Sequence, residues 1–112
     1  MINGIYHVKF SSSNHVFGEG LAFVSSELVN GGDHGYLYLG RITSNGGSLT
    51  GRLHIKRWNA SVASVFGAQQ AFDLDLLGTQ DASDRSFQVG GNVSGHPAQR
   101  ITIAGKFLSE LA

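Results

Sequence analysis

Apolar and polar residues alternate with a period of two in short stretches that recur about every ten residues along the chain. This alternation predicts β-strands with one buried and one exposed face. The predicted strands are residues 5–10, 16–25, 27–30, 36–43, 49–58, 72–76, 87–91 and 101–107. Most joins between them are too short for a parallel crossover, so we expect antiparallel neighbours.

A chain of 112 residues supplies material for one domain, residues 1–112, but hardly for two separate sheets. Closing the sheet on itself removes exposed strand edges, and the 16 glycines permit sharp coiling. We therefore predict an all-β fold, a small eight-stranded antiparallel up-and-down barrel. A β-sandwich is the alternative.

One connection, residues 60–71, is longer than the others. Within it, residues 61–67 predict one short helical turn, with Ser61 as a possible cap and Gly67 as a stop. The apolar side chains of this turn would lie close together and could cover an open end of the barrel. They are Val62, Val65 and Phe66.

Composition disfavours several classes of function. The eight basic and eight acidic side chains cancel, and no basic stripe is present, so nucleic-acid binding is not expected. The chain has no cysteine, and its five histidines are scattered, so we expect neither a metal site nor a cofactor. No signal peptide and no apolar run of membrane-spanning length are visible, which predicts a cytoplasmic protein without a membrane partner.

The stretch GGDHGYLYLG, residues 31–40, could form a phosphate cradle, half of a metal site or a turn. A phosphate cradle needs a helix after the glycines, whereas an aromatic, strand-like segment follows here. Asp33 and His34 match no metal-ligand spacing. We therefore predict a glycine turn in which Asp33 accepts local backbone hydrogen bonds.

Alternation assigns one face of each strand to the barrel interior. Eight-stranded barrels are either filled by side chains or hold one small ligand, and for so small a barrel a packed interior is favoured. Tyr6 and Tyr38 could orient a ligand, because a buried phenol needs a hydrogen-bond partner. The predicted inward residues are Tyr6, Val8, Phe10, Phe23, Tyr38, Ile42, Leu53, Ile55, Phe72, Leu74, Phe87, Val89, Ile101 and Ile103.

Three charged residues need separate treatment. Arg57 follows the face of Leu53 and Ile55, so it could stack on an aromatic ring such as Tyr6 near a barrel end, or lie solvated beyond the strand. Asp73 and Asp75 share one strand face, as paired catalytic carboxylates can. Because the opposite face is apolar, we expect both to point to water and predict no enzymatic activity.

Five short motifs follow one another along the chain: Gly4-Ile5-Tyr6 with Phe10, Gly18-Glu19-Gly20, GGDHGYLYLG, Arg57-Trp58-Asn59 and Ser64 to Gly67. In their order and spacing, these motifs resemble those of the GrlR-type proteins, which are negative regulators of type III secretion gene expression. The resemblance spans about Gly4 to Phe107. It implies a lipocalin-like barrel that forms a homodimer and binds a transcriptional activator through a loop of alternating acidic residues.

The turn that corresponds to this loop, Ser44 to Ser48, contains no acidic residue. We therefore expect any protein partner to contact apolar outer surface, for which Leu37, Leu39 and Leu77 are candidates, or the segment that contains Val65 and Phe66. The predicted function is a non-enzymatic regulatory module acting through protein contacts. The alternative is a carrier of a small apolar ligand in the lumen, with Tyr6, Phe10, Tyr38, Ile55, Arg57, Phe72, Phe87 and Ile103 as candidate contacts.

Overall fold

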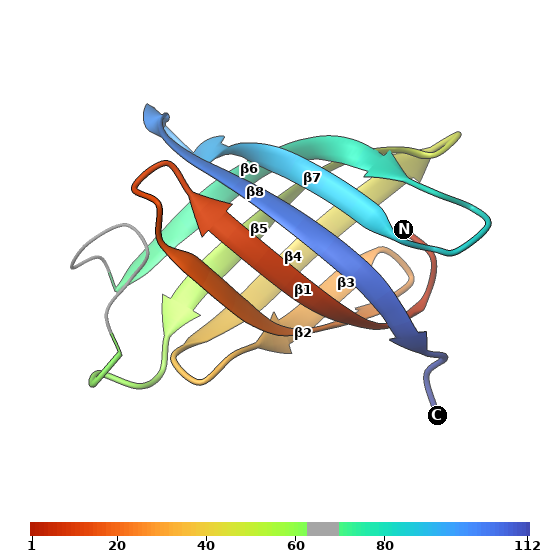
Figure 1. The fold of residues 1–112 in the computed structure, drawn as a ribbon, viewed down its shortest axis with the longest axis horizontal. Helices are drawn as coiled ribbons and strands as arrows, with labels where there is room; N and C mark the ends of the chain where they lie inside the picture. The colour runs from red at the N-terminus through yellow and green to blue at the C-terminus, as the bar shows by residue number, and fades with distance from the viewer. Residues whose placement is uncertain (63–69) are drawn as a thin grey trace.

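The fold is known from a computed structural model, which describes residues 1–62 and 70–112 (Figure 1). The strands are β1 (Gly4–Ser12), β2 (Phe17–Ser25), β3 (Leu28–Gly32), β4 (Tyr36–Asn45), β5 (Ser48–Arg57), β6 (Ala71–Gln80), β7 (Phe87–Val93) and β8 (His96–Ser109). Each strand pairs antiparallel with the next, and β8 returns to pair with β1. The sheet thus closes into the predicted eight-stranded up-and-down barrel.

The described residues include no helix. The predicted helical turn at residues 61–67 falls largely on residues 63–69, which lie outside the described part, as do Val65 and Phe66. Its first residues form an ordinary turn, in which the Val62 amide donates to the Asn59 carbonyl at 3.2 Å. Over the described residues, then, no helix has the length and apolarity to cross a membrane.

The inward face of the barrel is apolar, as the alternation predicts. Of the predicted inward residues, only Phe23 faces outward, with 41% of its surface exposed. Its neighbours Ala22 and Val24 are the buried ones, so β2 turns its smaller side chains inward. The prediction for Phe23 was wrong because both faces of β2 carry apolar residues, so the register with β1 and β3 decides which face is buried.

Two glycines make room for aromatic rings inside the barrel. A Cβ at Gly18 would collide with the ring of Phe10, and a Cβ at Gly105 would collide with the ring of Phe87. Both rings thus lie directly over neighbouring backbone. These glycines serve close packing as well as the coiling for which the sequence predicts them.

One end of the barrel, which we call the Tyr6 end, is filled by side chains. Tyr6 is fully buried, and its ring makes edge-to-face contacts with Phe87 and Phe107, at centroid distances of 5.3 and 5.6 Å. Its hydroxyl donates to the Ile2 carbonyl at 2.6 Å and accepts from Gln80 Nε2 at 2.9 Å. Burial raises the pKa of Tyr6, against the opposing effects of Gln80 and Arg85.

Candidate functional site

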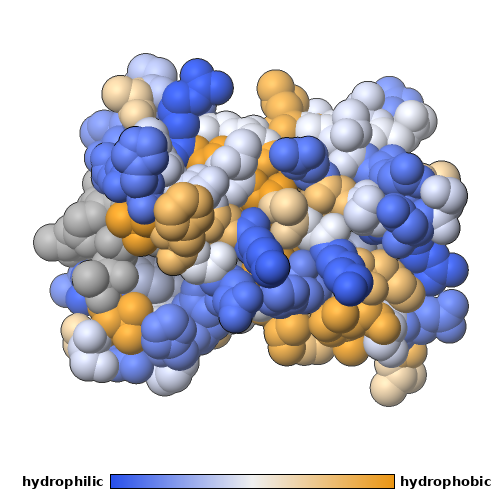
Figure 2. Space-filling model, in the orientation of Figure 1, coloured by the Kyte–Doolittle hydropathy of each residue, from blue (hydrophilic) through white to orange (hydrophobic). Residues whose placement is uncertain are grey.

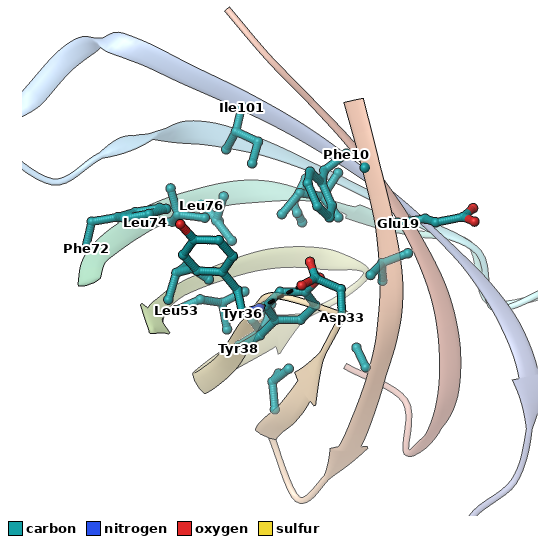
Figure 3. A pocket seen from close by; sticks show the side chains of 18 of the residues that line it. Phe10, Glu19, Asp33, Tyr36, Tyr38, Leu53, Phe72, Leu74, Leu76 and Ile101 are labelled. Atoms are coloured by element: carbon teal, nitrogen blue, oxygen red, sulfur yellow. Dashed lines mark hydrogen bonds between the residues drawn. The ribbon is translucent and has the colours of Figure 1, made fainter. Parts of the chain in front are cut away.

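A cavity of about 240 Å3 lies inside the barrel, lined mostly by aliphatic side chains (Figure 3). The sequence favours a packed interior, and the Tyr6 end is packed, but the remainder of the lumen is not. The aliphatic lining from the strands consists of Val8, Ala22, Val29, Ile42, Leu53, Ile55, Leu74, Leu76, Val89, Ile101 and Ile103. Because these side chains alternate along all eight strands, the apolar wall follows directly from the period-two pattern.

Aromatic rings gather toward the opposite end of the cavity, which we call the Asp33 end. Phe10 contacts Tyr38 edge to face at a centroid distance of 6.4 Å, and Tyr36 lies 6.5 Å from Phe72. Figure 3 shows these four side chains and Asp33 around one region of the lumen. Most of the aromatic lining therefore lies toward the Asp33 end, whereas Phe87 is a lining ring at the Tyr6 end.

Asp33 holds the turn between β3 and β4 and also carries the polar group of the cavity. Its Oδ1 accepts from the Gly35 and Tyr36 amides, at 2.8 and 2.7 Å, and its Oδ2 accepts from the Tyr38 hydroxyl. The predicted glycine turn with local bonds to Asp33 is thus confirmed. Burial raises the pKa of Tyr38, and the hydrogen bond to the Asp33 carboxylate raises it further, so this phenol stays protonated.

The residues after β5 clasp the same turn. The Trp58 indole Nε1 donates to the Asp33 carbonyl at 3.1 Å, and the Trp58 amide donates to the Gly35 carbonyl at 2.9 Å. Asn59 Nδ2 donates to the His34 carbonyl at 3.0 Å. Two motifs separated in sequence, GGDHG and Arg57-Trp58-Asn59, therefore build one structural unit at the Asp33 end.

Arg57 stacks on an aromatic ring near a barrel end, but the ring is not that of Tyr6. Its guanidinium carbon lies 5.9 Å from the centroid of the Tyr36 ring, and its Nε donates to the Tyr36 hydroxyl at 3.2 Å. Tyr6 sits at the other end of the barrel, where Arg85 stacks on Phe107 at 4.5 Å. Of the two alternatives left open for Arg57, the structure shows the stack, and its partner is Tyr36 instead of Tyr6 because alternation does not say at which end of the barrel a residue lies.

Most of the candidate ligand contacts do line the cavity, namely Phe10, Tyr38, Ile55, Phe72, Phe87 and Ile103. Tyr6 does not line the cavity, because its ring is packed within the Tyr6 end. Arg57 is not a lining residue either, but it contacts the lining residue Tyr36. Asp33 was predicted only as a turn residue, although its place before the Tyr36-x-Tyr38 pair is a sequence signal for the cavity. Met1 also lines the cavity, and no sequence signal pointed to it.

The two carboxylates considered for catalysis lie on the outer face of β6. Asp73 pairs with His54, with 2.8 Å between Oδ1 and Nδ1, and Asp75 pairs with Arg52, with 2.8 Å between Oδ1 and Nε. Hydrogen bonds from the Ser94 hydroxyl and from Arg52 lower the pKa of Asp75. Each carboxylate is thus engaged by a neighbouring strand. Within the described part of the chain, no cluster of three or more metal-ligating side chains occurs.

The family model described as "T3SS negative regulator, GrlR" matches residues 1–111. The chain belongs to the GrlR family. That family is one of negative regulators of the type III secretion system. None of the curated proteins matches the chain. The clasped turn and three of the aromatic residues at the Asp33 end, Phe10, Tyr36 and Tyr38, belong to the motifs that carried the resemblance.

This GrlR-family barrel has an apolar area on its outer surface, which we call the outer apolar face. It consists of Leu21 and Phe23 on β2 and Leu37 and Leu39 on β4, each between 37% and 41% exposed. The register places Gly32 between Leu21 and Leu37, and Asn30 between Phe23 and Leu39. Figure 2 shows apolar side chains gathered near the end of β2.

The remaining interface candidates fall elsewhere. Leu77 is 66% exposed on β6, where it pairs with Thr50 and Gly90, so it does not join the outer apolar face. The turn at Ser44 to Ser48 is a tight hairpin in which Asn45 pairs with Ser48. The turn carries no charge, because its residues are only serine, asparagine and glycine.

Proposed function

We propose that this GrlR-family chain represses type III secretion gene expression through protein–protein contacts and acts in the cytoplasm as a homodimer. Family membership supports the regulatory role. A net charge of zero and the absence of a basic stripe argue against direct binding to DNA. A regulator of this kind must therefore reach the transcription machinery through another protein.

The observation that carries the proposal is the outer apolar face. Four large apolar side chains lie on two strands that flank the short strand β3, whose intervening outward residues, Asn30 and Gly32, are small. This arrangement leaves the flanking side chains accessible to an apolar counterpart. Contiguous exposed apolar surface marks protein interfaces, whereas single exposed side chains such as Leu77 are ordinary.

A second copy of the chain is the occupant that we assign to this face. A two-fold dimer uses the same patch on both subunits, so one apolar face suffices for both halves of the interface. The neutral turn at Ser44 to Ser48 has no carboxylates with which to steer a basic partner. The regulatory partner is therefore expected to contact apolar surface as well.

The proposal is tested by substitutions on the outer apolar face. Phe23→Lys and Leu39→Lys should convert the dimer to a monomer in sedimentation experiments at micromolar concentration, because each places a charge in the interface. The same variants should relieve repression of a reporter driven by a type III secretion promoter. Leu77→Lys is the matched control, since it adds the same charge to an exposed leucine outside the face.

Changes in the neutral turn complete the test. Replacing Ser44 and Asn45 together by alanine should leave both the dimer and the repression intact. If the turn variant abolished repression in a folded protein while Phe23→Lys and Leu39→Lys did not, the contact would lie at the turn and the proposal would be wrong.

A further inference from the structure

The lumen has the size and the lining of a small-molecule site. An engineered apolar cavity of about 150 Å3 holds benzene, so the 240 Å3 found here corresponds to roughly ten non-hydrogen atoms. Apart from Phe87, the wall is aliphatic toward the Tyr6 end, and most of its aromatic rings lie toward the Asp33 end, where the hydroxyl of Tyr38 is also found. A molecule that fills it would be apolar along most of its length and polar at one end.

The charges at the Asp33 end select the polar group. Among the described lining residues, the ionisable side chains other than the tyrosines are Glu19, Asp33 and His34. Glu19 is exposed and pairs with His7 at 3.0 Å, and His34 is exposed as well. Arg57 is at this end too, where its Nε donates to the Tyr36 hydroxyl, but it is not a lining residue. Among the lining side chains, the half-buried carboxylate of Asp33 is therefore the charge beside a head group held at Tyr38, and it disfavours an anion there because a cavity screens repulsion poorly.

Tyr38 supplies the complementary hydrogen-bonding position. Its hydroxyl hydrogen is directed to Asp33 Oδ2, which leaves the phenolic oxygen able to accept a hydrogen bond. An uncharged hydroxyl group can donate to that oxygen without bringing a charge near Asp33. A carboxylate cannot donate at all in its ionised form.

We propose that the lumen binds a small neutral amphiphile of the alcohol class, with its apolar part among the aliphatic side chains and its hydroxyl at Tyr38 and Asp33. This site does not depend on the proposed regulatory role or on the outer apolar face. Its failure and the failure of the protein-contact proposal can therefore be told apart.

Two probes of equal chain length test the proposal by calorimetric titration of the purified protein. We expect 1-octanol to bind saturably with one molecule per chain, and at least tenfold more tightly than octanoate at neutral pH. If 1-octanol does not bind saturably, or if octanoate binds equally well, the proposal is overturned.

A substitution that fills the lumen locates the site. Ala22→Leu adds a side chain to the cavity wall and should abolish octanol binding. Phe23→Leu is the matched control on the outer face of the same strand, and it should bind octanol as the wild type does. If Ala22→Leu does not fold, nuclear Overhauser contacts between bound octanol and the wild-type protein decide the question: contacts to Ile101 and Val89 support the site, and contacts confined to Leu39 exclude it.

The role of Asp33 is tested by Asp33→Asn. The amide oxygen of asparagine can still accept from the Gly35 and Tyr36 amides, so the turn is retained while the charge is lost. The preference for octanol over octanoate should then fall severalfold, mainly because octanoate binds better. An unchanged preference in a folded variant would show that Asp33 does not select the head group.

Discussion

The two ends of the barrel are each organised around a buried tyrosine, but the two tyrosines have different surroundings. Tyr6 is enclosed by the rings of Phe87 and Phe107 and exchanges hydrogen bonds with a backbone carbonyl and an amide side chain. Tyr38 contacts the ring of Phe10, donates to the carboxylate of Asp33 and borders the cavity. Tyr6 is thus part of the packed core, whereas Tyr38 is part of the cavity wall.

This difference shows how one barrel can separate stability from binding. The Tyr6 end gains from complete packing, because each ring contact removes apolar surface from water. The Asp33 end contains part of the cavity and the carboxylate of Asp33. These add little to the stability of the core, but they determine the shape and polarity of the space open to a ligand. Substitutions at matched positions of the two ends should therefore have unequal effects on the free energy of unfolding.

The largest effect is expected for truncation of the two tyrosines. Tyr6→Ala should lower the free energy of unfolding by about 3–5 kcal/mol, as large-to-small changes in a packed core do. Tyr38→Ala should cost roughly half as much, since its ring already borders a cavity and loses fewer contacts. Urea denaturation measures both values. Equal losses would mean that the two ends are packed alike.

Alanine at two glycines provides a smaller and closely matched comparison. Gly105→Ala would press on the ring of Phe87, which Tyr6 holds in place, and should cost about 2 kcal/mol through overpacking. Gly18→Ala would press on the ring of Phe10, which can move toward the cavity, and should cost less than ~1 kcal/mol. Thermal unfolding followed by circular dichroism measures the difference. If Gly18→Ala were the more harmful change, the cavity could not absorb a displaced ring.

The smallest effect at neutral pH, and one that grows in alkali, concerns the phenol groups. Both tyrosines have raised pKa values in the folded state, so the stability linked to them is fully present below the unfolded pKa near ~10 and is lost as the pH rises above it. The rise is greater at Tyr38, where Asp33 adds to burial, than at Tyr6, where Gln80 and Arg85 oppose it.

Tyr38→Phe should remove an alkaline loss of stability of up to roughly 1.4 kcal/mol per pH unit above ~10, and Tyr6→Phe should remove a smaller loss over the same range. Urea midpoints measured across this pH range test the expectation, with the wild type as the reference. A steeper alkaline loss in Tyr38→Phe than in the wild type would contradict it.

Much of the fold could be predicted because alternation reports directly on which face of a strand is buried. The strand order, the closure and an apolar interior follow from that pattern and from the short joins, although the predicted inward set left out buried residues such as Val24, Val29 and Leu49. Phe23 is the exception, because both faces of β2 carry apolar residues and only the register with β1 and β3 decides between them.

The candidate site was less accessible to sequence reasoning. Its wall could be predicted, whereas the volume left between the side chains depends on how rings from different strands meet in space. The clasp of Trp58 and Asn59 on the Asp33 turn is likewise a contact between distant segments, and neither stretch alone contains a signal for it. The partner of Arg57 was missed for the same reason.

The pairing of β1 with β8 has a consequence for how the chain folds during synthesis. All the other strand pairs are between neighbours along the chain and can form as soon as their second strand has left the ribosome. The pairing of Ile5 with Ser109 must wait until β8 has been made, about a hundred residues after β1. Until then β1 keeps an unpaired edge exposed, so association with other nascent chains is most probable in the interval just before β8 emerges.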